Sequence, residues 1–280
     1  MSPPFNSQPR SRRTRGKSCP GRLSRLDSWT CHHAEALLRR SDGRWAKAVV
    51  VDLGIGARPW TTIETARAYR QLKPDLELIG VDNDPLRVTN AQAHAIPGVS
   101  FREGGFALPL APTEPARLIR AMNVLRQYRR DDVAAAHHAM SRHLLEGGLL
   151  IAGSSNRQGE TLVALLLRGV PGGLQREGLL FATDFSKGFA PRMFRRTLPR
   201  DLRAGAHPIG PIQDFLSLWH AAWRSARTSR NTGQTEVFIE SAQRLAERVS
   251  GVDTDPWSLS NGILVWRTPG GVPDPSGSGN

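Results

Sequence analysis

The chain has 280 residues, of which 39% are hydrophobic, so it is long enough to bury one large core or a core with an appendage. It contains no apolar run of about 18 residues, which argues against a transmembrane helix, and its N-terminus lacks the apolar segment of a secretory signal. The formal net charge is +13, but only four of the 38 basic residues are lysine. Because a GC-rich coding sequence also favours arginine, this charge leaves a nucleic-acid partner open without implying one.

Both ends of the chain are poor in apolar residues. Residues 1–26 carry seven basic residues and no acid, which predicts a disordered basic tail, and the Gly-, Pro- and Ser-rich residues 268–280 predict a second one. The only cysteines, Cys19 and Cys31, provide no disulfide framework and are typical of a reducing, cytoplasmic setting. Cys31 precedes two histidines, but no further ligands recur at a metal-binding spacing, so we predict no metal site.

Strands and helices alternate in the first half of the chain. In order, the patterns predict a helix at 27–40 capped by Asp27, a strand at 47–53, a helix from a capping box of Thr61 and Glu64 to Leu72, a strand at 76–82, a helix opened by Asp84 and Pro85, strands at 99–101 and 117–124, a helix from Asp131 to Leu145 ended by Gly147 and Gly148, and a strand at 149–153. This alternation indicates an α/β fold with a doubly wound, mostly parallel sheet over residues 27–155.

The remainder, residues 156–267, reads as a C-terminal helical insertion with closing strands. The patterns predict an apolar helix at 162–170, a strand at 178–185, amphipathic helices at 211–226 and 235–249, and a strand at 261–267. Ligands of doubly wound sheets bind outside the carboxyl ends of the strands, where the strand order reverses. The functional residues are therefore expected just after the strands of the first half.

Four segments at predicted strand ends are rich in glycine or polar residues. They read VVVDLGIG at 49–56, LIGVDNDP at 78–85, FREGGFALPL at 101–110 and MNVLRQY at 122–128. Together with LEGGLLI at 145–151, they resemble the class I S-adenosylmethionine-dependent methyltransferases, and in the NVLRQY segment a subgroup of bacterial methyltransferases of unassigned substrate. The resemblance covers about residues 46–154 and implies a Rossmann-like fold that binds S-adenosylmethionine.

The resemblance also implies roles for single residues. Gly54 and Gly56 would let the backbone approach the cofactor, and Asp52 would accept a hydrogen bond near its methionine end. Asp82 would accept bonds from both ribose hydroxyls, since a carboxylate can take two at once. Asn83, Gly105 and Phe106 would lie beside the adenine of the cofactor, and Asn123 would lie beside its methyl group. The residues facing the substrate would be Arg126, Gln127 and Tyr128. Gly105 stands where the family often has an aspartate, so the adenine contact departs from the family's pattern.

Two observations argue against a dinucleotide cofactor. Arg58 and Pro59 stand where a third glycine would allow close helix packing, and Asp82 follows Gly54 by 28 residues rather than the roughly 20 of a dinucleotide fingerprint. An NAD(P)-dependent dehydrogenase is therefore the weaker enzyme alternative. A protein that binds the cofactor without catalysis also remains open.

The methyl acceptor is not specified by any motif. We expect a small molecule, with RNA as the alternative, because the segment 189–203 holds five arginines and one acid and is either an anion-binding face or a solvated loop. Tyr128, His137 or His138 could be proposed as a general base, but the two histidines fall on a predicted helix and are expected to be surface or packing residues. Trp219 and Trp223 form a helical stripe expected in the core.

Overall fold

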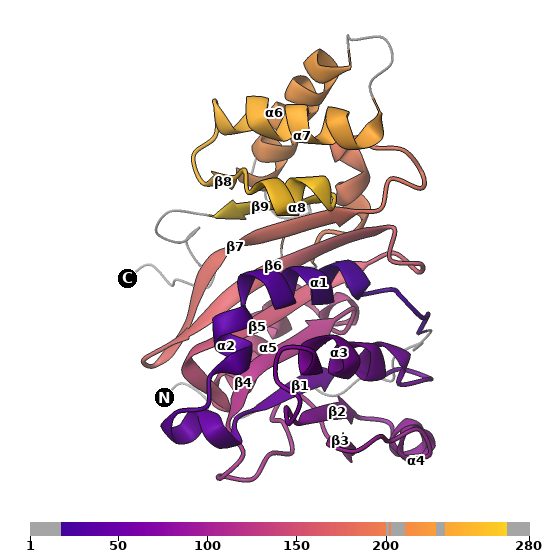
Figure 1. The fold of residues 1–280 in the computed structure, drawn as a ribbon, viewed down its shortest axis with the longest axis vertical. Helices are drawn as coiled ribbons and strands as arrows, with labels where there is room; N and C mark the ends of the chain where they lie inside the picture. The colour runs from indigo at the N-terminus through magenta and orange to yellow at the C-terminus, as the bar shows by residue number, and fades with distance from the viewer. Residues whose placement is uncertain (1–17, 200–201, 203–210, 228–232, 268–280) are drawn as a thin grey trace, which may run out of the picture.

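The computed structural model describes residues 18–199, 202, 211–227 and 233–267. Within these residues a single mixed sheet has the strand order β3-β2-β1-β4-β5-β6-β7-β9-β8 (Figure 1). Its strands are β1 (Val49–Leu53), β2 (Leu78–Asp82), β3 (Val99–Glu103), β4 (Ala116–Met122), β5 (Leu144–Ser155), β6 (Thr161–Val170), β7 (Gly173–Thr183), β8 (Val252–Asp253) and β9 (Ile263–Arg267). The α/β class predicted from the sequence is confirmed.

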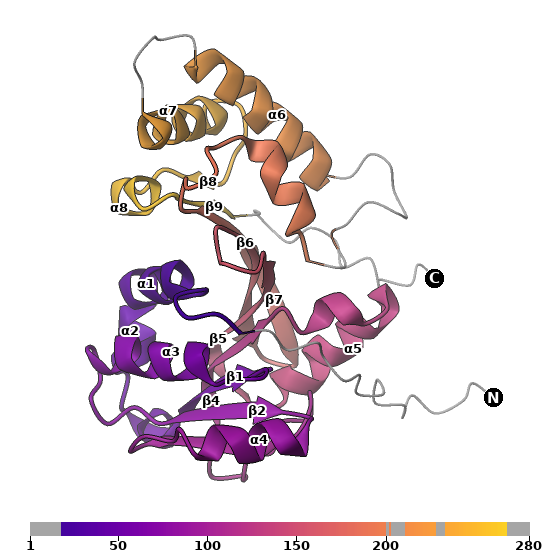
Figure 2. The same cartoon turned by 90° about the vertical axis from the view of Figure 1, so that its right-hand side faces the viewer.

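Helices cover both faces of the sheet. They are α1 (Ser24–His33), α2 (Glu35–Arg39), α3 (Trp60–Arg70), α4 (Pro85–Gln92), α5 (Arg130–Ser141), α6 (Pro211–Ala226), α7 (Gln234–Ala246) and α8 (Pro256–Ser260), with 3₁₀ turns η1 (Gly43–Lys47), η2 (Leu125–Gln127) and η3 (Pro191–Arg196). Viewed along the sheet, α1, α2 and α3 lie on one side and α5 on the other (Figure 2). None of the described helices is long and apolar enough to cross a membrane.

The first five strands are parallel, and their order creates the expected ligand position. β2 and β3 lie on one side of β1, and β4 and β5 lie on the other. The chain therefore reverses its direction across the sheet between β1 and β4, and loops after these two strands diverge at the carboxyl edge. β1, β2 and β4 are buried along their whole length, because helices cover both of their faces.

The helix predicted at 162–170 is wrong, because this segment is the central strand β6. It pairs antiparallel with β5 and β7, and its alternate residues enter two different cores. Val163 and Leu165 pack on the α5 and α6 side, whereas Leu162 and Ala164 pack on the α1 and α3 side. A strand buried on both faces is apolar at every position, so it lacks the alternation that distinguishes a strand from a buried helix.

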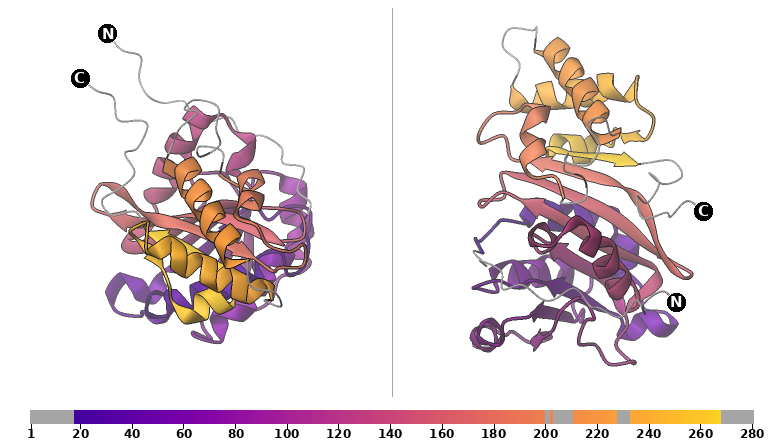
Figure 3. Two further views of the ribbon diagram at one scale, coloured as in Figure 1. Left: turned by 90° about the horizontal axis from the view of Figure 1, so that it is seen from above. Right: turned by 180° about the vertical axis from the view of Figure 1, so that it is seen from behind.

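The other strands and helices of the C-terminal part are confirmed. β7 and β9 extend the sheet antiparallel, and α6 and α7 pack on each other at that end of the molecule (Figure 3). Trp219 and Trp223 are buried in the core, as expected, and the Trp219 ring stacks on Phe194 with centroids 5.5 Å apart. This end of the sheet is therefore closed by an aromatic cluster.

The predicted N-terminal tail is too long. Residues 18–26 are ordered against the core: Leu23 and Leu26 are buried, and the Ser18 hydroxyl accepts a hydrogen bond from the Arg58 N–H at 3.1 Å. Two of the seven basic residues, Arg22 and Arg25, lie in this stretch, and both are partly buried. The rest of the predicted tail, 1–17, and the C-terminal tail, 268–280, lie outside the described residues.

Three helix ends also differ from the prediction. Asp27 does not cap a helix, because α1 begins three residues earlier and buries the carboxylate. α3 begins after Pro59 without a side-chain cap, and Glu64 instead accepts a hydrogen bond from the Gly21 N–H at 3.0 Å. α5 ends at Ser141, and Gly147 and Gly148 lie inside β5 rather than at a helix end. Only Asp84 caps its helix as predicted, by accepting from the Leu86 N–H.

Candidate functional site

The glycine turn after β1 requires glycine for two reasons. Gly54 and Gly56 have φ angles of +91° and +76°, a region that side chains other than glycine rarely adopt. In addition, a Cβ on Gly54 would lie 2.5 Å from Cγ2 of Val124, the residue after Asn123 at the end of β4. The turn is therefore fitted closely against the loop that follows the neighbouring strand.

Asp82 ends β2 and holds the glycine turn in place. Its Oδ2 accepts a hydrogen bond from the Gly56 N–H at 3.0 Å, and its Oδ1 accepts one from the Asp84 N–H at 3.1 Å. The side chain is only 2% exposed, and Nη1 of Arg87 lies 3.6 Å from Oδ1. Each carboxylate oxygen accepts one backbone bond and keeps capacity for another.

The predicted adenine-side residues have different environments. Asn83 and Gly105 are partly exposed beside Asp82 and after β3, and a Cβ on Gly105 would meet no atom within 4 Å. Phe106 is buried, and its ring packs edge-on against Tyr128 with centroids 5.0 Å apart. Phe106 and Tyr128 therefore support each other in the core, while Gly105 borders open space.

Asn123 occupies a strained backbone position at the end of β4. Its φ of +64° is unusual for a residue other than glycine, and its amide is bound on both sides by Ser155. Nδ2 donates to the Ser155 hydroxyl at 3.1 Å, and Oδ1 accepts from the Ser155 N–H at 3.0 Å. Nε of Arg22 donates to the same hydroxyl at 2.9 Å. The ordered N-terminal segment thus reaches the carboxyl edge of the sheet.

Asp52, the acid of the glycine signature, belongs to a buried ion network. Its Oδ1 accepts from Arg120 Nε at 2.9 Å, and its Oδ2 accepts from the Thr62 hydroxyl at 2.6 Å. Nη1 of Arg120 also binds Asp27 Oδ1 at 2.6 Å, so one guanidinium serves two carboxylates. These groups are almost fully buried: Asp27 and Asp52 are 3% exposed and Arg120 is 0% exposed.

Burial sets the titration of this network. Loss of solvent raises the pKa of Asp27 to about 6, although Arg120 and the Thr65 hydroxyl act in the opposite direction. Burial by itself would lower the pKa of Arg120, but the charges of Asp52 and Asp27 raise it above its usual value. The arginine therefore stays charged, whereas Asp27 titrates near pH 6.

A small depression lies beside Asn123 on the α5 side of the sheet. It is lined by Leu125, Arg126, His137, Ala152, Gly153, Ser154, Leu165 and Pro199. Arg126 is exposed at its rim, whereas Gln127 is half-buried and Tyr128 is buried. Of the two histidines on α5, His137 lines the depression and His138 is exposed. The structure thus brings Arg126 and His137 together next to the predicted methyl donor side.

In the sequence, no pattern marks Asp27, Ser155 or Arg22 as parts of this region. The available signal was the pair Arg117 and Arg120 inside the strand RLIRAM, because a buried guanidinium requires hydrogen-bond acceptors. Arg117 finds them in backbone carbonyls, such as that of Ala48, whereas Arg120 binds carboxylates. Asp27 lies 93 residues away and is also compatible with a helix cap, so its partnership could not be read from spacing.

Solved structures similar to this chain include S-adenosylmethionine-dependent methyltransferases. One is a putative sarcosine dimethylglycine methyltransferase from Galdieria sulphuraria, at 17% identity, with 47% of this chain and 46% of that chain covered and a TM-score of 0.35. Another is magnesium protoporphyrin IX methyltransferase from Synechocystis PCC 6803 with bound SAH, at 18% identity, 48% and 54% coverage and a TM-score of 0.36. A third is SAM-bound CalS10, an amino pentose methyltransferase from Micromonospora echinaspora, at 20% identity, 56% and 69% coverage and a TM-score of 0.34.

These similarities are partial. The chain spans about half or less of the length of the first solved structures that it matches. No family model matches the sequence, and no curated protein matches it.

Proposed function

We propose that the protein is an S-adenosylmethionine-dependent methyltransferase that acts on a small molecule. The observation that carries the proposal is the convergence of the glycine turn, Asp82 and Asn123 at one edge of the sheet. They follow three adjacent strands, β1, β2 and β4, next to the point where the strand order reverses. This is the arrangement that the class I methyltransferase resemblance requires.

The residues present fit the adenosyl cofactor. Asp82 keeps one acceptor position on each oxygen for the two ribose hydroxyls, and the open space beside Gly105 leaves room for an adenine ring. Arg87 lies over Asp82 and has to swing away, or share the carboxylate, when the ribose binds. Asn123 would then lie on the methyl-donor side of the cofactor. Contact of Asp52 with the cofactor stays a prediction, because Arg120 and Thr62 already bind the two carboxylate oxygens of Asp52.

The chemistry asks little of the protein beyond positioning. The sulfonium of the bound cofactor supplies an already activated methyl group, so the chain has to align the acceptor in line with it and exclude water. We place the acceptor in the depression beside Asn123. Arg126 at its rim would bind an anionic group of the acceptor, and His137 would take the proton of a hydroxyl acceptor.

Calorimetric titration of the purified chain with S-adenosylhomocysteine, S-adenosylmethionine, NAD and NADP tests the cofactor assignment. We expect binding of the two adenosyl ligands alone. Binding of only a dinucleotide would refute the proposal and favour a dehydrogenase.

An Asp82→Asn variant tests the ribose role. It removes the charge and one acceptor while it keeps the size of the side chain, so adenosyl binding should fall by about tenfold or more. The exposed Asp75→Asn is the matched control, because its carboxylate binds Lys73 before the start of β2, and Asp82 lies at the other end of that strand. Unchanged affinity in Asp82→Asn, with unchanged melting temperature, would contradict the role.

A specific observation keeps RNA as the alternative acceptor. Arg192, Arg195 and Arg196 are exposed on η3, and the charges of Arg192 and Arg195 contribute, after burial, to the lowered pKa of His220 on α6. Methylation of small RNA fragments that is lost in an Arg192→Ala, Arg195→Ala double variant, without loss of S-adenosylhomocysteine binding, would favour this second function.

A further inference from the structure

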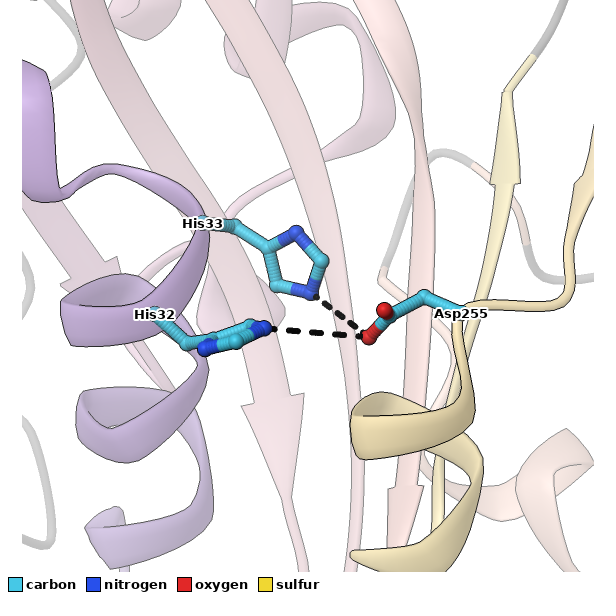
Figure 4. Close-up of side chains that lie close together, drawn as sticks. All are labelled: His32, His33 and Asp255. Carbon is cyan, nitrogen blue, oxygen red and sulfur yellow. Dashed lines mark ion pairs between the residues drawn. The ribbon is translucent and has the colours of Figure 1, made fainter.

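Two histidines and an aspartate from opposite ends of the chain converge at the junction of α1 and α8. His32 and His33 end α1, and Asp255 precedes α8 as its N-cap (Figure 4). The Nε2 atoms of His32 and His33 lie 3.9 Å and 3.6 Å from the same atom, Oδ2 of Asp255. All three ligand atoms lie within 4.8 Å of one another.

We propose that His32, His33 and Asp255 form a binding site for a divalent transition metal, with Zn²⁺ as the preferred ion. The site is separate from the glycine turn and from the depression beside Asn123, and the proposal does not rest on methyltransferase activity. It goes beyond the sequence, in which the two histidines have no third ligand within reach because Asp255 lies more than 220 residues later.

The distances suit a metal ion. Zinc binds imidazole nitrogen and carboxylate oxygen at about 2.0–2.2 Å, so neighbouring ligands of a tetrahedral site lie about 3.4 Å apart. Two of the three separations exceed this value by about half an ångström or less. The His32 side chain is 42% exposed, and a small rotation of it would bring its Nε2 atom closer to Asp255.

Aromatic neighbours hold the imidazole rings in orientation. The His32 ring stacks on Trp257 with centroids 4.2 Å apart and planes 17° apart, and the His33 ring stacks on Trp29 at 5.0 Å. Neighbouring residues of a helix point about 100° apart, so two consecutive histidines rarely serve one ion. Here both Nε2 atoms nevertheless point toward Asp255 (Figure 4).

The carboxylate is also held in place. Oδ2 of Asp255 accepts a hydrogen bond from the Ser258 N–H at 2.8 Å, and the same oxygen faces the two imidazoles.

Ligand chemistry selects the class of ion. Two imidazoles and one carboxylate favour Zn²⁺, Co²⁺ or Ni²⁺ over Mg²⁺ and Ca²⁺, which prefer oxygen ligands. Three protein ligands leave one position for water. The ion would replace the hydrogen bond of 2.6 Å between His33 Nε2 and the Ser258 hydroxyl. A bound ion would tie α1 to α8 and so fix the N-terminal segment, which reaches the carboxyl edge through Arg22.

Metal titration of the untagged, full-length protein tests the site. We expect one equivalent of Zn²⁺ or Co²⁺ to bind, with no response to Mg²⁺ at the same concentration. Binding should raise the melting temperature by about 5 °C when the free ion exceeds its dissociation constant about 100-fold. Co²⁺ should give the visible absorption of a site with nitrogen and oxygen ligands.

Two variants and two controls locate the ion. Asp255→Asn retains an N-cap for α8 but loses the carboxylate, and His32→Ala removes the most exposed ligand; each should lower the affinity by more than about tenfold. His138→Ala, an exposed histidine on α5, should leave it unchanged. Cys31→Ser should also leave it unchanged, because the group of ligand atoms within 4.8 Å of one another is His32, His33 and Asp255 and does not include Cys31.

The outcomes separate clearly. A drop in affinity in Asp255→Asn and His32→Ala alone supports the site. The proposal is overturned if Zn²⁺ does not bind below millimolar concentration, if these two variants bind as the wild type does, or if Cys31→Ser abolishes binding. None of these results depends on whether the protein binds S-adenosylhomocysteine.

Discussion

The buried network of Arg120 with Asp27 and Asp52 predicts that substitutions of its members lower the free energy of unfolding by unequal amounts. Arg120→Met would leave two carboxylates buried without a positive charge, and loss of one partner of a buried ion pair typically costs about 3–5 kcal/mol. We expect a cost at the upper end of this range at pH 7.5, because two acids lose their partner at once. Asp27→Asn leaves the Arg120–Asp52 pair intact and removes the surplus negative charge.

The size of the Asp27 effect follows from its titration. The pKa is about 6 in the folded protein against 3.8 for a free carboxyl, so the folded state holds the proton more tightly than the unfolded state. The stability contributed by protonation of Asp27 is therefore fully present below pH 3.8 and is lost as the pH rises to about 6. At about 1.4 kcal/mol for each pH unit, the loss reaches at most about 3 kcal/mol.

Asp27→Asn mimics the protonated carboxyl at every pH. Its Oδ1 can still accept from Arg120, and its Nδ2 can donate to the Thr65 hydroxyl, which already donates to the Thr61 carbonyl at 2.8 Å. At pH 7.5, we expect the variant either to lower the free energy of unfolding by less than about 1.5 kcal/mol or to increase it.

Urea denaturation of the wild type and both variants from pH 4 to pH 8 is the assay. The unfolding free energy of the wild type minus that of Asp27→Asn should fall as the pH rises from 4 to 6 and then level off. Arg120→Met should regain stability at pH 4, where its two carboxyls can be protonated. The reasoning is refuted if the wild-type-minus-Asn difference is independent of pH, or if Asp27→Asn costs as much as Arg120→Met at pH 7.5.

Two further predictions concern the glycine turn and a surface ion pair. Gly54→Ala should lower the free energy of unfolding, measured by denaturation, by about 2–4 kcal/mol, because the new Cβ combines a positive φ with an overlap on Val124. Gly172→Ala is the control and should cost only about 1–2 kcal/mol, because Gly172 has a φ of +80° but no atom within 4 Å of the added Cβ. Equal costs for the two variants would contradict the overlap. Glu114 receives two bonds from Arg102, at 2.7 and 2.8 Å, and these, with a bond from the Ala111 N–H, lower its pKa to about 2. This stabilisation is present above pH 4.5 and is lost as the pH falls toward 2; because the side chain is 26% exposed, we expect Glu114→Gln to cost about 1–2 kcal/mol at pH 7 and nothing at pH 2, and a cost that persists at pH 2 would refute it.

The sequence predicted those parts of the fold that depend on local signals. Asp82 and the glycines mark strand ends because turns need those residue types, and the Asp84–Pro85 pair opens a helix through a cap that lies within three residues. The same local signals misled where a distant partner competes for the side chain. Thr61 and Glu64 have the spacing of a capping box, yet Glu64 binds the Gly21 backbone, 43 residues earlier in the chain.

For the same reason, local signals did not predict the strand at residues 162–170 or the cluster of His32, His33 and Asp255. A run such as LVALLLRGV is apolar because two layers cover it, and only the pairing with β5 and β7 shows that it is a strand. Likewise, His32 and His33 acquire a carboxylate only when α8 folds back on α1. Tertiary contacts, rather than propensity, determine both.

Packing alone accounts for most of the glycine signature, and this sharpens the functional question. Asp52 neutralises Arg120, Gly54 makes room for Val124, and Asp82 holds the Gly56 N–H, so a chain that binds no cofactor would need the same residues. Asn123 is different, because its positive φ costs about 1–3 kcal/mol and a glycine there would avoid that cost. Its amide is held by Ser155 at the edge where a methyl donor would lie. An Asn123→Gly variant loses these two bonds, at about 1 kcal/mol each, but also loses the strain, so it should change stability little and lose affinity for S-adenosylhomocysteine. If Asn123→Gly instead lowers the melting temperature and leaves this affinity intact, the strain serves the β4–β5 junction and not the cofactor.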